Sequence, residues 1–228
     1  MSLRQRAGRL RSSMKIGVFD SGIGGLSVAT AIEVALSEHE VMFVDDRQHL
    51  PYGTKSPEEL EQLVIPMLNK LVVSGCRVIV VACNTVTTTL IDTLRQRIQV
   101  PLVGVEPMIK PAAEQTKSGT IAVCATPTTL NSERYKQLKT QFADGVKVLE
   151  PDCSDWSAMI ENNVINHTKI TEQIDNVCQQ GADVIVLGCT HYHWIEETIT
   201  DIARGRATVI QPEAAIVAQL KRVIAQQT

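Results

Sequence analysis

The segment GCRVIVVAC, residues 75–83, returns 106 residues further along the chain as GADVIVLGC, residues 181–189. Each copy is a nearly continuous run of β-branched and other apolar residues, which is typical of a parallel strand covered on both faces. IGVFDS at 16–21 pairs with IAVCAT at 121–126 at an offset of 105, and Val41 pairs with Val146 at that same offset. Three strand pairs whose offsets agree within one residue predict a duplicated chain with two half-length lobes of the same topology.

Strands and helices alternate outward from these segments. Expected strands, some continuing into a turn or helix, cover residues 15–19, 40–45, 76–83, 100–105, 120–129, 146–151, 182–191 and 207–212. Helices are expected from about 22 to 38, at 57–74, 84–98, 155–163 and 168–180, and after 212; Ser56, Pro57 and Glu59 form a capping signal. The alternation predicts an α/β fold of two pseudo-symmetric, doubly wound parallel-sheet lobes, with the active site in the cleft between them.

Length and composition set the expected organisation. The 228 residues carry a net charge of −3, with 44% hydrophobic, 21% charged and 4% aromatic residues, as in an ordinary globular protein. We expect residues 14–106 with 208–228 as an N-terminal-type lobe, 107–207 as the second lobe, and 1–13 as a disordered extension. Without a basic excess or an apolar run of about 18 residues, neither nucleic acid nor membrane is an expected partner. Six cysteines without a secretion signal predict free thiols and a cytoplasmic location.

Cys83 and Cys189 occupy the same position in the two repeats, at the end of a strand and before an expected helix. A helix N-terminus favours the thiolate form of such a residue. Asn84-Thr85 and Thr190-His191 follow directly, and their side chains with the first-turn amides suit a carboxylate ligand.

Two facing thiols could form a redox disulfide, bind a metal, or act as a pair of acid and base groups. The absence of C-x-x-C weakens the first reading, and Cys189-Thr-His191-Tyr-His193 lacks a standard zinc spacing. The third possibility, a pair of acid and base groups, requires a substrate that loses a proton from one face and regains it on the other, which is racemisation without a cofactor.

Gly22-Ile-Gly24-Gly25 lacks the third glycine of a dinucleotide loop and predicts a tight strand-to-helix turn. No lysine stands out as a Schiff-base former.

Six motifs resemble the glutamate racemase family of the aspartate/glutamate racemase superfamily, in order from Met14 to about Ala225. They are FDSGIGGLSV (19–28), LPYG (50–53), ACNT (82–85), GVEP (104–107), ATPTTLNSERY (125–135) and LGCTHY (187–192). The resemblance implies a cofactor-independent, cytoplasmic enzyme that interconverts L- and D-glutamate and supplies D-glutamate for peptidoglycan. It also implies a homodimer. The alternatives are an aspartate or hydantoin racemase of the same fold, and a protein that clamps an acidic ligand without turnover.

The resemblance implies roles for particular residues. Cys83 and Cys189 would be the two acid/base groups, assisted by Asp20, His191 and Glu161. The expected substrate-binding residues are Asp20, Ser21, Tyr52, Gly53, Asn84, Thr85, Thr126, Thr129, Thr190 and His191.

Three positions depart from the family pattern. Thr128 stands where glycine is usual, Ser154 where proline is usual, and His193-Trp194-Ile195 replaces Pro-Leu-Leu. We expect His193 at the surface or an interface, and Trp156 and Trp194 in packing or at an interface.

Overall fold

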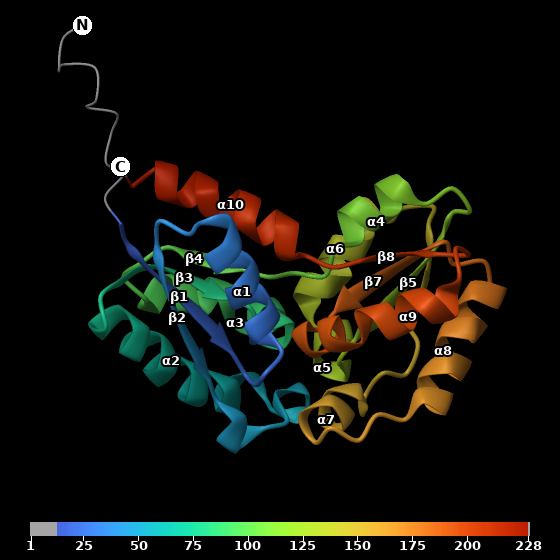
Figure 1. The fold of residues 1–228 in the computed structure, drawn as a ribbon, viewed down its shortest axis with the longest axis horizontal. Coiled ribbons are helices and arrows are strands. Elements are labelled where there is room, and N and C mark those ends of the chain that lie inside the picture. Colours follow the sequence, from blue (N-terminus) through green and yellow to red (C-terminus); the bar gives the residue numbers. More distant parts are fainter. Residues whose placement is uncertain (1–12, 228) are drawn as a thin grey trace, which may run out of the picture.

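The computed structural model describes residues 13–227, so all but Ser13 of the expected N-terminal extension lies outside the described residues. The described chain forms two four-stranded, all-parallel sheets, ordered β2-β1-β3-β4 and β6-β5-β7-β8 (Figure 1). The strands are β1 Lys15–Asp20, β2 Glu40–Asp45, β3 Cys76–Val81, β4 Leu102–Gly104, β5 Thr120–Ala125, β6 Lys147–Leu149, β7 Val184–Gly188 and β8 Thr208–Ile210. The identical strand orders confirm the predicted α/β fold of two pseudo-symmetric lobes.

Helices cover both faces of each sheet, which is why the central strands are apolar along their whole length. On the first sheet, α1 (Gly25–Ala35) and α10 (Glu213–Ala225) enclose one core, and α2 (Pro57–Val73) and α3 (Asn84–Arg97) enclose the other. On the second, α7 (Trp156–Glu161), α8 (His167–Gln179) and α9 (Glu196–Ala203) lie on one face, and α4 (Ile109–Gln115) and α6 (Glu133–Phe142) on the other. The remaining short helices are α5 (Pro127–Asn131), η2 (Arg47–His49), η3 (Tyr52–Thr54) and η4 (Thr190–Ile195).

The helix that follows the last strand of each sheet crosses to the other lobe. α4 follows β4 of the first sheet but packs on β7 and α6, whereas α10 follows β8 of the second sheet but packs on α1, β3 and β4. Figure 1 shows α10 lying over the first lobe and α4 over the second. Because β8 pairs with β7, the second lobe extends past residue 207, and the chain returns to the first lobe at α10 rather than at residue 208.

Local signals explain why some helices were predicted and others were not. The capping box at the start of α2 is present, with Ser56 and Glu59 each bonded to the other's backbone N–H. Residues 127–142 form α5 and α6, which apolar periodicity did not predict because α6 buries only Tyr135 and Leu138. Their signals are caps instead: Thr126 and Ser132 each accept the N–H of the residue three positions on.

No helix among residues 13–227 is both long enough and apolar enough to cross a membrane.

Candidate active site

The carboxyl ends of the strands of both lobes meet around a cavity of about 140 Å³. Ten of the predicted residues line it: Ser21, Tyr52, Gly53, Cys83, Asn84, Thr85, Thr126, Cys189, Thr190 and His191. The cavity brings together motifs more than 100 residues apart, and both predicted acid/base thiols lie in its wall. Asp20, Thr129 and Glu161 are not in the lining and instead bond to residues that are.

Cys83 is the residue immediately before α3, as the repeat predicted, and its side chain is almost fully buried. Its thiol donates to Ser21 Oγ, with the sulfur 3.5 Å from that oxygen. Burial, together with the nearby charge of Asp20, raises the pKa of Cys83 to about 12, although its hydrogen bonds with Ser21 and with the N–H of Val86 act in the other direction. The N–H of Val86 at the start of α3 does favour the thiolate, as predicted, but desolvation outweighs it and the net effect favours the thiol.

Cys189 has a different environment. η4, the element after it, is a short 3-10 helix rather than the expected α-helix, so its dipole is small. An imidazole lies there instead: His191 Nδ1 is 3.7 Å from Cys189 Sγ, and His191 Nε2 is 2.6 Å from Glu161 Oε1. Burial lowers the pKa of His191, but its hydrogen bonds to Cys189 and Glu161 outweigh this and raise it to about 10. The raised pKa favours the protonated ring of His191, which lies between the sulfur of Cys189 and the carboxylate of Glu161.

Changing Glu161 to Gln tests this charge pair while keeping a hydrogen-bond acceptor. The pKa of His191 rises from 6.5 to about 10 on folding, so its stabilisation is present below pH 6.5 and is lost as pH rises through 10. We expect E161Q to cost about 1–2 kcal/mol of unfolding free energy at pH 6, and less at pH 10. Urea unfolding at the two pH values measures this, and NMR titration should show a lower pKa for His191 in E161Q. A stability deficit that is the same at both pH values would contradict the pairing.

Asp20 joins the two lobes behind the cavity. Its Oδ1 accepts the N–H of Gly22 at 3.0 Å, and its Oδ2 accepts the hydroxyl of Thr190, from the other lobe, at 2.9 Å. Burial raises the pKa of Asp20 above its ordinary value, although the positive charge of His191 and these bonds act against it. Asp20 is therefore a carboxyl group that accepts a proton more readily than one in water.

The glycines after Asp20 form the predicted tight turn, and the second lobe explains why side chains are excluded. A Cβ on Gly22 would collide with Glu161 Oε1, and one on Gly24 would lie 2.5 Å from the backbone nitrogen of His191. The N–H of Ile23 donates to Glu161 Oε1 at 2.7 Å. The loop that carries Thr190 and His191 therefore packs directly against this turn.

Threonines form a second connection between the lobes. Thr85 Oγ1 of α3 lies 3.0 Å from Thr126 Oγ1, and Thr126 donates to Thr129 Oγ1 at 3.0 Å. Thr129 is fully buried, so the structure places it as a support for Thr126 rather than in the cavity wall, where the resemblance had implied it. Asn84 Nδ2 donates to Val105 O at 2.9 Å, and its Oδ1 is buried without a hydrogen-bond partner among residues 13–227.

Among the residues that were not predicted are Ser157, in the cavity wall, and Asp46, which bonds to the lining residue Tyr52. Ser157 Oγ lies 3.6 Å from Cys189 Sγ; it is four residues before Glu161 on α7, a spacing that places both on one helix face. Asp46 follows β2 at the same sheet edge as Asp20, is buried, and accepts the hydroxyl of Tyr52 at 2.7 Å. Helix spacing and strand-end position were the signals that could have identified them.

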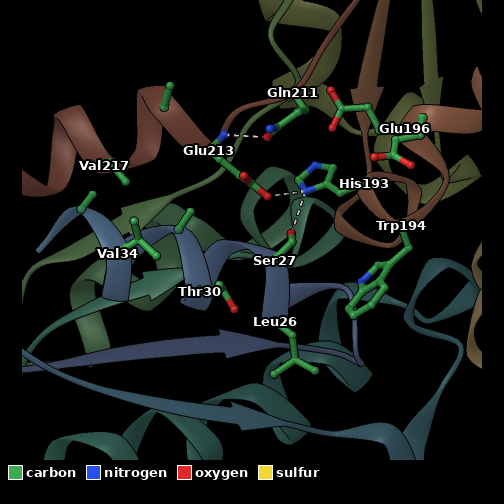
Figure 2. Close-up of a pocket in the computed structure, with 14 residues that line it drawn as sticks. Leu26, Ser27, Thr30, Val34, His193, Trp194, Glu196, Gln211, Glu213 and Val217 are labelled. Carbon is green, nitrogen blue, oxygen red and sulfur yellow. Dashed lines mark hydrogen bonds and ion pairs between the residues drawn. The ribbon is translucent and has the colours of Figure 1, made fainter. Parts of the chain in front are cut away.

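The His193-Trp194 departure lies in a separate, larger hollow of about 960 Å³ between α1, α10 and the start of α9 (Figure 2). The imidazole of His193 is buried, with Nδ1 2.9 Å from Ser27 Oγ and 3.5 Å from Glu213 Oε1. Of the two expected positions, the surface is wrong for this ring, because the ring is buried at the interface where η4 of the second lobe meets two helices of the first. Trp194 is half exposed at the edge of the hollow, whereas Trp156 is buried against Tyr192 in the core.

The other two departures adjoin the cavity. Ser154 is part of its wall, and the Thr128 hydroxyl on α5 donates to the carbonyl of Gly53 in the first lobe. Within residues 13–227, no three His, Cys, Asp or Glu side chains are grouped so that they could hold a metal ion.

Comparison with known proteins agrees with this geometry. A sequence profile of the family described as "Asp/Glu/Hydantoin racemase" matches residues 16–220, and the chain therefore belongs to this family of isomerases. It is 37% identical over 219 residues to a glutamate racemase of Ralstonia pickettii, covering 94% of this chain and 78% of that protein. A glutamate racemase of Ectopseudomonas mendocina is 35% identical, with 95% and 84% covered. These relatives place the chain among the glutamate racemases of the family.

Solved structures show the same fold. A glutamate racemase isoform of Bacillus anthracis superposes with a TM-score of 0.83 at 28% identity, covering 95% of this chain and 83% of that one. The Escherichia coli glutamate racemase in complex with L-glutamate gives a TM-score of 0.81 at 26% identity, with 93% and 83% covered.

Proposed function

We propose that this protein interconverts L- and D-glutamate by a two-thiol mechanism that requires no cofactor. The single observation that carries the proposal is that Cys83 and Cys189, one from each lobe, line the same small cavity. One sulfur, as the thiolate, takes the α-proton of the substrate, and the C–H electron pair stays on the α-carbon as a carbanion. The other, as the thiol, gives its proton to the opposite face. The reaction ends with the protonation states of the sulfurs exchanged, ready for the reverse direction.

The two sulfurs have different surroundings. Burial raises the pKa of Cys83 to about 12 and so favours its thiol form. Beside Cys189, the ring of His191 lies with Nδ1 3.7 Å from the sulfur. Each sulfur also has a route for its proton: Cys83 contacts Ser21, which contacts Asp20, and Cys189 contacts His191, which contacts Glu161.

Polar groups in the wall suit the charged ends of an amino acid. The buried Asn84 Oδ1, which lacks a partner among the described residues, can accept from the substrate ammonium. The hydroxyl of Thr85 and the first amides of α3 can donate to carboxylates. Donors fixed in a cavity with little water stabilise charge that develops on the α-carboxylate as the proton leaves.

The wider role follows from the substrate. We propose that the product D-glutamate supplies peptidoglycan synthesis in the cytoplasm, and that the protein acts as a homodimer.

Circular dichroism of purified protein with L-glutamate and no added cofactor tests the activity. We expect the signal to decay to zero as the racemate forms. An unchanged glutamate signal with a decaying L-aspartate signal would reassign the substrate. If glutamate binds but deuterium from the solvent does not enter its α-carbon, the protein is a binding protein and the proposal is wrong.

A further inference from the structure

The Thr128 hydroxyl crosses from one lobe to the other at the cavity wall. Thr128 lies on α5, directly after the second-lobe strand β5, and it donates to the carbonyl of Gly53 in η3 of the first lobe. Both elements line the cavity, η3 through Tyr52, Gly53 and Thr54, and α5 through Pro127 and the preceding Thr126. The bond therefore joins parts of the wall that come from different lobes.

The first-lobe partner is held in place by its own contacts. Tyr52 donates to Asp46 Oδ2 at 2.7 Å, and His49 Nδ1 lies 2.7 Å from Asp46 Oδ1. The N–H of Lys55 donates to Tyr52 O at 3.2 Å and closes the η3 turn. Because this loop is anchored to the first lobe, a bond from Thr128 to its backbone acts on the distance between the lobes.

The approach between the two elements is close. A Cβ on Gly53 would lie only 3.2 Å from Thr126 Cβ, which leaves no room for a water molecule between these atoms. Hydroxyl groups also connect the lobes nearby, where Thr85 Oγ1 lies 3.0 Å from Thr126 Oγ1 and 3.5 Å from Thr129 Oγ1. Thr126 lines the cavity, whereas Thr128 does not. The Thr128 hydroxyl therefore connects the two lobes without contacting a substrate in the cavity.

We propose that Thr128 is a positioning residue that latches α5 to the η3 loop and holds the cavity closed around its ligand. The proposal rests on the racemase function proposed above and adds a determinant of substrate affinity to it. Losing the hydroxyl favours the open state of the lobes, which weakens substrate binding while leaving both sulfurs and their partners unchanged. The effect should therefore be on KM rather than on kcat.

The test compares Thr128→Val, which keeps the branched shape, with Thr128→Ser, which keeps the hydroxyl. Loss of one hydrogen bond predicts a KM about 5-fold higher in T128V, with kcat within about 2-fold of wild type. T128S should restore the wild-type KM. Thr140→Val is the matched control, because Thr140 is exposed on α6 and its hydroxyl donates to the carbonyl of Lys136 in its own helix. An equal KM in T128V and wild type, or a T128S variant as impaired as T128V, would overturn the latch.

Hydrogen–deuterium exchange separates this proposal from the proposed function. In T128V without substrate, the amide of Lys55 should exchange several-fold faster than in wild type, because the η3 turn has lost its hydrogen bond from Thr128. This readout needs no catalysis. If wild-type protein fails to racemise glutamate, the proposed function fails, while faster exchange at Lys55 would still support the latch. Unchanged exchange would overturn the latch even in an active enzyme.

Discussion

Changing either Cys83 or Cys189 to alanine should reduce glutamate racemisation by about 10²–10⁴-fold, the range that one acid or base group contributes. Each substitution removes the group that serves one face of the substrate, so neither sulfur can compensate for the other. Circular dichroism with L-glutamate and with D-glutamate measures the rate in both directions. Full racemisation by either variant would refute the two-thiol mechanism.

Solvent deuterium exchange gives a sharper outcome for the same variants. With one thiol left, a variant can still remove and return a proton on one face, so we expect exchange into one enantiomer without inversion, and opposite enantiomers for the two variants. Cys76→Ala is the matched control. Cys76, the first residue of β3, is a buried cysteine in the same core as Cys83. Unlike Cys83, it is not part of the cavity wall. Its racemisation rate should stay within about 2-fold of wild type, although unfolding should cost about 1 kcal/mol.

Changing Gly24 to alanine should lower kcat/KM by about 100-fold, the loss expected when reacting groups are displaced by about 1 Å. Gly24 has φ −53° and ψ −39°, so alanine introduces no backbone strain. Its Cβ, however, would lie 2.5 Å from the backbone nitrogen of His191 and 2.6 Å from Thr190 Oγ1. Because a backbone atom cannot rotate away, the second lobe must move, and Cys189 and His191 move with it.

Gly145→Ala controls for the general effect of adding a methyl group. Gly145 has φ +74° and no heavy atom within 4 Å of the new Cβ, so alanine there would introduce backbone strain but no clash. We expect a stability loss of about 1 kcal/mol for G145A from the left-handed backbone, with racemisation unchanged. We expect G24A to lose about 1–3 kcal/mol of unfolding free energy, measured in urea, in addition to its loss of activity. If G24A were as active as G145A, the turn would not position the second lobe.

The duplicated strands explain how much the sequence alone could predict. GCRVIVVAC and GADVIVLGC share a length, an apolar pattern and a terminal cysteine, and a parallel sheet places its strand ends along one edge. These shared features are enough to predict two sheets of the same order, with Cys83 and Cys189 as a candidate pair at equivalent positions. A place at or just after a strand end also brings Ser21, Asn84, Thr126 and Thr190 into the cavity wall.

What the sequence by itself determined, then, was the topology of each lobe and the residues at its strand ends, because both follow from local apolar patterns and chain direction. Only the tertiary structure decided which groups act on each thiol. Burial, which depends on the whole surrounding fold, raises the pKa of Cys83, and His191 meets Glu161 across 30 residues of chain. The exchange of α4 and α10 between lobes and the bond from Thr128 to Gly53 likewise depend on how the two lobes pack, which no local pattern encodes.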